Sequence, residues 1–266
     1  MARVAAVLVL VLLVAGCGSR RAVAVHVTPG NSVEDQPIQI VVDGLRPHQI
    51  VALRLRSTDT KGVAFGAKAT FAADAHGIVD VDHASARTGS AYSGVWPMGL
   101  LTSMSAPSAP PFTPYFWGKT PQRFTLTASV AGRAVASTTF RRGLPDGRFT
   151  VEDETVPKDG FDGFYYAPAG ASRRPAVLMF GGSEGGVGRS LLGALLAAHG
   201  VPTLDIGYFH APGLPSALKN IPLEYFRGAL EWLDRRPQVD PSRVSVLGVS
   251  RGSEAALLLG VHYPQL

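Results

Sequence analysis

The chain has 266 residues, of which 46% are hydrophobic and 17% charged, and its formal net charge at pH 7 is +5. This length and composition are typical of a globular protein with two modest domains or one large domain. The basic residues are scattered in short pairs rather than gathered in a stripe, which disfavours nucleic-acid binding. The single cysteine, Cys17, excludes an internal disulfide framework and a cysteine-based metal site, and we expect neither a metal nor a cofactor.

The first residues of the chain resemble the signal of a bacterial lipoprotein. Arg3 precedes an apolar stretch, residues 4–14, that is too short to span a bilayer comfortably. A Val-Ala-Gly-Cys sequence ending at Cys17 resembles a lipobox, so we expect Cys17 to be lipidated. Residues 1–16 are then a signal peptide and residues 17–23 a tether, which predicts a protein anchored by lipid to the cell membrane, outside the cytoplasm. The alternative is an ordinary secretory signal.

The next part of the chain, residues 24–145, is predicted to be an antiparallel β-sandwich domain. Apolar and polar side chains alternate over residues 36–42, 50–56 and 124–140, and Gly132 marks a hairpin turn within the last of these. Short strands separated by glycine, proline and aspartate are typical of sandwiches. A glycine- and proline-containing stretch follows Arg142, so we place the domain boundary between residues 145 and 146.

From residue 146 the pattern changes to strands alternating with helices. We expect a pair of strands first, then a buried strand, a helix, a second strand, a helix beginning at Pro222 and a strand that follows a proline-rich break. Such alternation implies a mostly parallel sheet with flanking helices. The expected elements are strands at 149–156, 160–167, 176–180, 201–206 and 243–247, helices at 190–199 and from 222, and the break at 237–241.

The most informative motif is the sequence Gly248-Val249-Ser250-Arg251-Gly252, which lies between an apolar run and an alanine- and leucine-rich run, residues 254–260. A serine at a sharp strand-to-helix turn, flanked by glycines two residues either side, is the nucleophile elbow of α/β-hydrolases. The glycines leave room for neighbouring backbone, and the turn exposes the serine hydroxyl. Ser250 is therefore the candidate nucleophile. The alternative is a glycine-rich turn without chemistry.

A second glycine-rich loop, residues 181–188, follows the buried strand at 176–180. In α/β-hydrolases this loop supplies a backbone N–H to the oxyanion, and the residue after the nucleophile supplies another. We expect the donors to be Arg251 and Gly182, with Ser183 next to it. The loop lacks the Gly-Lys-Ser/Thr ending of a phosphate loop and matches the dinucleotide-binding pattern only weakly.

A base for Ser250 is harder to find. His262 lies twelve residues after Ser250, about 18 Å along a helix, whereas a base must lie about 3 Å away. His210 follows a strand and lies on the same rim as Ser250, but a loop histidine without a catalytic role is the alternative. Asp205 is expected to be structural. The Arg251 side chain opposes the helix dipole, a cost that Glu254 or an anionic substrate group would offset.

These motifs together resemble the acyl-CoA thioesterase and bile acid-CoA:amino acid N-acyltransferase family. The resemblance is carried by Phe180-Gly181-Gly182, by residues 204–208 and 218–259, and by two upstream motifs, Pro97-Met98-Gly99-Leu100-Leu101 and Ser103-Met104. It implies an immunoglobulin-like N-terminal domain and an α/β-hydrolase C-terminal domain. The family's later aspartate and histidine have no counterpart here, so we expect a domain that is incomplete at its C-terminal end.

By the same resemblance, Ser250 takes an acyl group from a thioester or ester and passes it to water, because serine at this position points to hydrolysis. The alternatives are an N-acyltransferase-like protein, a surface lipoprotein without enzymatic activity, and a peptidase or dienelactone-hydrolase-like enzyme. Export across a membrane would favour an ester or thioester other than acyl-CoA, which is cytoplasmic. The chain as it stands is inactive if the acid and base are missing.

Overall fold

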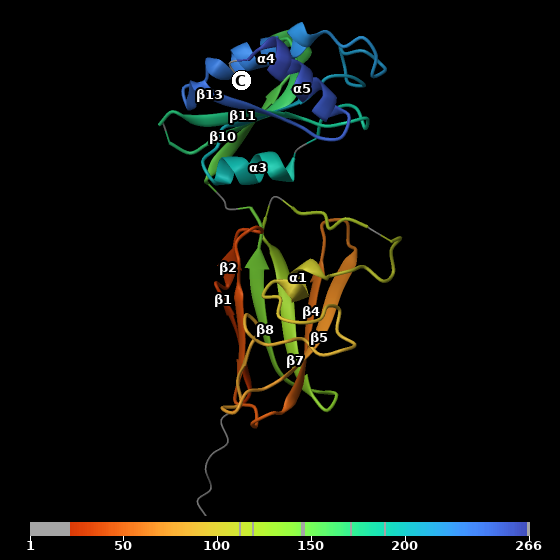
Figure 1. Cartoon of the computed structure of the whole chain (residues 1–266), viewed down its shortest axis with the longest axis vertical. Helices are drawn as coiled ribbons and strands as arrows, with labels where there is room; N and C mark the ends of the chain where they lie inside the picture. The colour runs from red at the N-terminus through yellow and green to blue at the C-terminus, as the bar shows by residue number, and fades with distance from the viewer. Residues whose placement is uncertain are drawn as a thin grey trace, which may run out of the picture.

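The structure is a computed structural model that describes residues 22–111, 113–118, 120–144, 147–170, 172–188 and 190–264. The predicted signal peptide, Cys17 and all but the last two residues of the tether lie outside these ranges, as do both residues of the predicted domain boundary. Figure 1 shows two lobes, an N-terminal one made of strands and a C-terminal one in which helices cover a sheet. None of the described helices is long and apolar enough to cross a bilayer.

The N-terminal lobe contains two sheets that enclose one apolar core. Its three-stranded sheet has the order β1-β3-β6 and its five-stranded sheet the order β2-β8-β7-β4-β5. This confirms a β-rich N-terminal region built around one core. The elements are β1 (Ala24–Thr28), β2 (Asn31–Ser32), β3 (Gln39–Asp43), β4 (Ile50–Thr58), β5 (Ala64–Ala72), β6 (Val79–Asp80), α1 (Gly99–Thr102), β7 (Gln122–Val130) and β8 (Arg133–Arg142).

The alternation in the sequence fixes which side chains of β4 and β5 enter this core. Val51, Leu53 and Leu55 are fully buried, whereas the residues between them point to solvent, as a strand period of two requires. The predicted hairpin joins β7 to β8 through Ala131 and Gly132, whose φ angles are +48° and +79°. Two positive φ values in a two-residue loop are typical of the turn whose twist suits a hairpin.

The C-terminal lobe is built on a five-stranded sheet of order β13-β11-β12-β10-β9. Strands β11, β12 and β13 run parallel, and β10 pairs antiparallel with β9 and β12. The predicted antiparallel strand pair is confirmed, but the sheet is mixed rather than mostly parallel, because two of its four strand pairings are parallel and two are antiparallel. The elements are β9 (Phe149–Glu154), α2 (Val156–Asp159), β10 (Asp162–Pro168), β11 (Arg174–Phe180), α3 (Leu191–Ala198), β12 (Thr203–Gly207), α4 (Leu223–Asp234), β13 (Val239–Gly248) and α5 (Gly252–His262).

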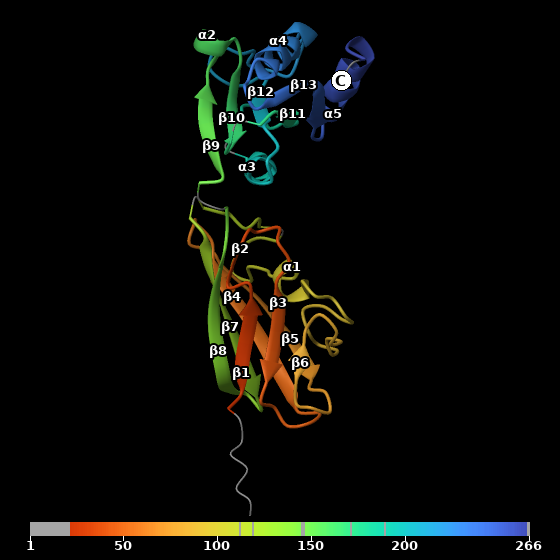
Figure 2. The ribbon, with the colours of Figure 1, turned by 90° about the vertical axis from the view of Figure 1, so that its left-hand side faces the viewer.

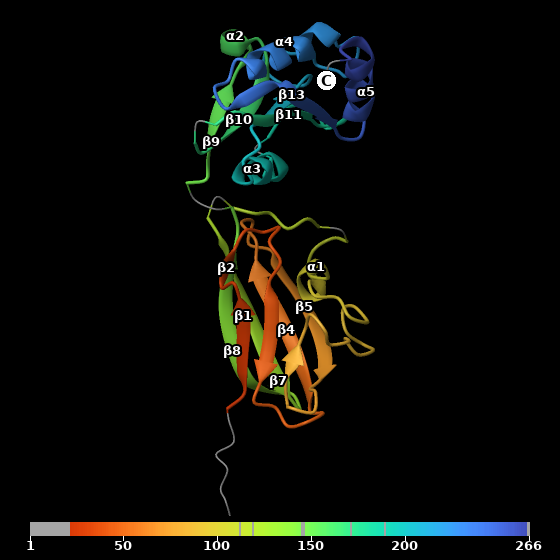
Figure 3. The same ribbon diagram turned by 60° about the vertical axis from the view of Figure 1, so that its left-hand side comes forward.

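The helices cover both faces of this sheet. Figures 1, 2 and 3 show α3 on the face turned toward the N-terminal lobe and α4 and α5 on the other face. Helix α4 buries an apolar stripe through Phe226, Leu230 and Leu233 against the sheet. Parallel strands covered by helices on both faces are the α/β architecture that the alternating pattern predicted.

Two local predictions need correction. The strand before the elbow begins at Val239, so Asp240 and Pro241, predicted to lie in a break, belong to β13. Proline is tolerated there because the register between β13 and β11 shifts at this point, and residues 240–243 have no register partner in β11. Pro222 has extended backbone and caps α4 rather than forming its first turn.

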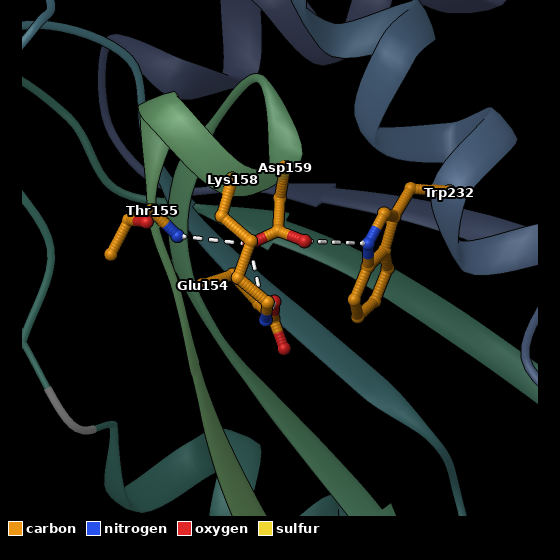
Figure 4. A network of polar contacts seen from close by, with 5 residues as sticks. All are labelled: Glu154, Thr155, Lys158, Asp159 and Trp232. Carbon is orange, nitrogen blue, oxygen red and sulfur yellow. Dashed lines mark hydrogen bonds and ion pairs between the residues drawn. The ribbon is translucent and has the colours of Figure 1, made fainter.

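A polar network fixes the turn between β9 and β10 against α4 (Figure 4). Asp159 accepts hydrogen bonds from the indole N–H of Trp232 at 3.3 Å and from the Thr155 N–H at 3.2 Å. Lys158 donates to the buried Glu154 at 2.8 Å. Burial raises the pKa of Glu154, partly offset by that lysine. The network has a structural role, because it joins a turn to a helix that packs beneath the elbow strand.

Candidate active site

The elbow has the geometry that the sequence motif predicted. Ser250 lies between β13 and α5 with a φ of +54°, a left-handed conformation that an L-residue adopts at a cost of about 1–3 kcal/mol. A Cβ at Gly248 would lie 2.2 Å from the Gly252 carbonyl oxygen, and one at Gly252 would lie 2.3 Å from the Gly181 carbonyl oxygen. Both positions therefore require glycine, and Ser250 itself remains exposed.

The glycine-rich loop after β11 approaches the serine directly. Phe180 and Gly248 are register partners in the parallel pair β11–β13, so both loops leave the same edge of the sheet. A Cβ at Gly182 would lie 2.7 Å from Ser250 Cβ and 3.1 Å from its Oγ. The structure thus brings Gly182 and Ser250 into contact, and the absence of a side chain at Gly182 makes that contact possible.

The three predicted oxyanion donors differ in their present partners. The Gly182 N–H donates to the Glu184 carboxylate at 2.8 Å. Within the described ranges, the N–H groups of Ser183 and Arg251 have no hydrogen-bond acceptor. A carboxylate oxygen therefore already occupies one of the three predicted donors, the Gly182 N–H. The N–H groups of Ser183 and Arg251 are free of acceptors among the described residues. Glu184 was not singled out by its sequence, because its only signal is its place two residues after Gly182.

Tyr208 holds the loop in place, a role that sequence reasoning also missed. Its hydroxyl lies 3.1 Å from the Gly181 carbonyl and 3.0 Å from the Gly182 carbonyl, and donates to them. Its ring packs against Phe180 and Phe226 in the core of the lobe. Burial raises the pKa of Tyr208, so the hydroxyl keeps its proton. These two hydrogen bonds fix the orientation of the loop backbone next to Ser250.

The histidines and acids are placed as follows. His262 is the last residue of α5, as predicted, far from the elbow along the helix. His210 is exposed, has a φ of +55° and touches the loop, since a Cβ at Gly185 would lie 2.6 Å from its own Cβ. Among the residues that the structure describes, none forms a hydrogen bond with Ser250 Oγ, so no base contacts this candidate nucleophile.

Asp205 is a buried acid in β12. It is hydrogen-bonded to Ser190 at the start of α3 and is 6% exposed. Burial raises its pKa to about 7; the Ser190 hydrogen bond opposes this, and the nearby charge of Glu184 adds to it. Its contact with α3 fits the predicted structural role. The described part of the chain contains no cluster of three or more His, Cys, Asp or Glu that could hold a metal ion.

The Arg251 side chain pairs with Glu254, one of the two partners that the sequence suggested. Their nitrogen and oxygen atoms lie 2.5 Å apart, and both side chains are about 60% exposed. An exposed pair of this kind is worth at most about 1 kcal/mol. That is comparable to the cost of a cation in the first turn of a helix, so no substrate group is needed to explain Arg251.

Comparison with known proteins identifies similar families and relatives. Residues 35–150 match the model "Acyl-CoA thioester hydrolase/BAAT N-terminal region", and residues 221–266 match "BAAT / Acyl-CoA thioester hydrolase C terminal". Acyl-coenzyme A thioesterase 6 of Mus musculus is 33% identical over 237 residues, which cover 86% of this chain and 55% of that protein. Bile acid-CoA:amino acid N-acyltransferase of Mus musculus is 30% identical over 90% of this chain and 58% of that protein. The chain spans about half the length of the curated relatives it matches.

Among solved structures, the chain is similar to an esterase of Pyrobaculum calidifontis, with 24% identity, a TM-score of 0.34, and coverage of 43% of this chain and 40% of that one. It is also similar to esterase Est22, with 22% identity, a TM-score of 0.36, and coverage of 46% and 41%. Likenesses at these TM-scores carry no weight for function. The matches to both regions of one family, over most of the chain, are specific. The chain belongs to the acyl-CoA thioesterase and bile acid-CoA:amino acid N-acyltransferase family.

Proposed function

We propose that the protein is a serine acyl hydrolase that cleaves a thioester or ester through an acyl-enzyme on Ser250. The observation that carries this proposal is the strained, exposed Ser250 with its Oγ directly against Gly182. Backbone strain of this size persists only where the surrounding structure enforces it, and it is common at catalytic residues. The relatives of the chain, which include acyl-coenzyme A thioesterases, support the same reaction class.

In the proposed reaction, Ser250 Oγ attacks the acyl carbonyl carbon, and a new C–O bond forms while the hydroxyl proton passes to a base. The carbonyl oxygen becomes an oxyanion that the free N–H groups of Arg251 and Ser183 stabilise. Collapse of this intermediate breaks the bond to the leaving thiol or alcohol, which takes up the proton. Water then attacks the acyl-enzyme by the same route and releases the carboxylic acid.

The Glu184 carboxylate is relevant to this scheme because it occupies the N–H of Gly182, the donor that the sequence favoured. An oxyanion at that N–H would have to displace it. The scheme therefore assigns stabilisation first to Ser183 and Arg251, with Gly182 joining when Glu184 moves aside.

Two candidates exist for the base that takes the proton from Ser250. His210 is the described histidine nearest to the glycine loop, whereas the family resemblance implies an aspartate and a histidine that follow the elbow. These two candidates for the base predict different results for His210→Ala. The substitution abolishes turnover if His210 is the base, and leaves turnover if the base is a histidine that follows the elbow. His262→Ala is the matched control, because His262 lies at the far end of α5.

We further propose that the N-terminal region is the immunoglobulin-like domain of the family and that Cys17 carries a lipid anchor that holds the protein outside the cytoplasm. If so, an ester or thioester other than acyl-CoA is the natural substrate class. Metabolic labelling with a fatty-acid probe tests the anchor. The label should be incorporated by the protein and lost in Cys17→Ser, and labelling that survives this change would contradict the anchor.

Turnover of acyl-CoA and of nitrophenyl esters tests the proposed activity. Ser250→Ala should lower kcat by at least about 10³-fold, as loss of a nucleophile does. Ser253→Ala is the matched control, since Ser253 is an exposed serine in the first turn of α5, just after the elbow, and should keep most of the activity. Equal activity in Ser250→Ala and the parent would contradict the proposal and favour a surface lipoprotein without enzymatic activity.

A further inference from the structure

The outer face of the five-stranded sheet in the N-terminal lobe carries a groove that neither the family nor the elbow explains. The groove has a volume of about 960 Å³, which is at the upper end of the range of small-molecule sites. Its floor is formed by β4, β5 and β7, which lie side by side in Figure 1. Four of the residues that line it are cations: Arg54, Arg56, Lys68 and Arg123.

The wall of the groove consists of two chain segments that pair with the free edge of β5. Ser105 forms a two-way backbone bridge with Gly66, with N–O distances of 2.9 and 3.0 Å. Ala91 N–H donates to the Lys68 carbonyl at 2.8 Å, and Ser90 Oγ accepts the Thr70 N–H at 2.9 Å. These bonds fix the wall to the floor, so the basic side chains lie in a recess rather than on a flat face.

The charges in the groove are not compensated. Arg54 and Lys68 are directly opposite each other across β4 and β5, and Arg123 is directly opposite Arg141 across β7 and β8. Like charges at directly opposite positions destabilise a sheet. Across the described ranges, none of these cations forms an ion pair, and no Asp or Glu lines the groove.

The lining also supplies neutral donors of the kind that bind phosphate oxygens. Ser90, Ser105, Ser108 and Thr125 present hydroxyl groups. The Ser90 hydroxyl already accepts the Thr70 N–H, which leaves its own hydrogen free to be donated outward. Several guanidinium or ammonium groups together with hydroxyl donors match a phosphate group, which carries up to two charges and three acceptor oxygens.

We propose that this groove binds a soluble ligand through a multiply charged phosphate group. A single carboxylate would leave most of the four cations without a partner, whereas a diphosphate carries more charge and more acceptor oxygens and can pair with several of them. A base-stacking nucleic acid is disfavoured because the lining contains one aromatic residue, Phe65, which is 5% exposed. A flat anionic membrane is disfavoured because the cations line a groove that two chain segments border. The site does not depend on Ser250.

Calorimetric titration of the full chain with inorganic pyrophosphate tests the proposal. We expect saturable one-to-one binding whose affinity falls at least tenfold in the double variant Arg54→Gln/Lys68→Gln. The control is Arg133→Gln/Arg235→Gln, which removes the same charge from exposed positions outside the groove and should change the affinity less than twofold. Equal losses in the two doubles, or no saturable binding by the parent, would overturn the proposal.

Two further measurements distinguish a soluble phosphate from a lipid headgroup and test the charge repulsion. Vesicles containing phosphatidylglycerol should not compete with pyrophosphate, and binding to vesicles without pyrophosphate binding would overturn the soluble-ligand proposal. In phosphate-free, low-salt buffer, Arg54→Gln/Lys68→Gln should melt at a higher temperature than the parent, because the repelling pair is removed. A lower melting temperature would contradict the claim that these charges repel.

Discussion

In the C-terminal lobe the unfavourable feature is backbone strain concentrated at Ser250, whereas in the N-terminal lobe it is repulsion spread over four cations on a sheet face. Both features face solvent, and neither stabilises the fold in which it occurs. Strain at one turn suits a reacting atom, because it fixes the position of that atom. Uncompensated charge suits a ligand, because the ligand itself supplies the missing charge.

The largest effect on stability is expected at Gly252, the glycine at the end of the elbow. Gly252→Ala would bring a Cβ within 2.3 Å of the Gly181 carbonyl oxygen, so we expect a loss of about 3 kcal/mol or more in the free energy of unfolding. Gly260→Ala, in the same helix, has nothing within 4 Å of its added Cβ and should stabilise by up to about 1 kcal/mol. Urea unfolding measures both, and similar results for the two variants would contradict the packed elbow.

The buried carboxyl of Asp205 is a second unfavourable feature of the C-terminal lobe. If it costs more folding free energy than the strain at Ser250, the contrast between the two lobes does not hold. Its pKa is raised to about 7 by burial, so between about pH 4 and pH 7 the unfolded carboxyl loses a proton that the folded one keeps. The contribution of this group to stability should therefore be greatest below pH 4 and should fall as the pH rises to 7, by up to about 4 kcal/mol.

Asp205→Asn should remove that part of the pH dependence. The control is Glu34→Gln, because burial also raises the pKa of Glu34 to about 7 and that change should remove only its own contribution. Unfolding free energies measured from pH 4 to pH 8 compare the variants. A parent-like slope in Asp205→Asn would show that Asp205 is not proton-linked to folding.

Relief of the strain at Ser250 should have the smallest effect. Ser250→Gly can adopt a φ of +54° without penalty and should raise the free energy of unfolding by up to about 1 kcal/mol, after the greater freedom of glycine in the unfolded chain is subtracted. Ser250→Ala keeps the strained backbone and should leave it unchanged within about 0.5 kcal/mol. If thermal melting ranks alanine above glycine, the strain lies elsewhere.

The sequence predicted the elbow, the glycine loop and the order of strands and helices, because each of these depends on neighbouring residues. It did not predict that Glu184 occupies the Gly182 N–H or that Tyr208 holds the loop carbonyls, since both depend on side-chain directions. The basic groove depends on strand register, which places Arg54 opposite Lys68 across two strands. Pro241 was predicted to lie in a break between a helix and a strand. The sequence alone does not show that a proline falls where the register of a strand shifts.

The central claim is that Ser250 is a nucleophile at a strained turn, and covalent labelling tests it most directly. The protein isolated from its own cells is treated with a fluorophosphonate, and the modified peptide is identified by mass spectrometry. The account predicts an adduct on Ser250 Oγ that is absent from Ser250→Ala and retained in Ser253→Ala. No adduct at Ser250, or unchanged labelling of Ser250→Ala, would contradict it.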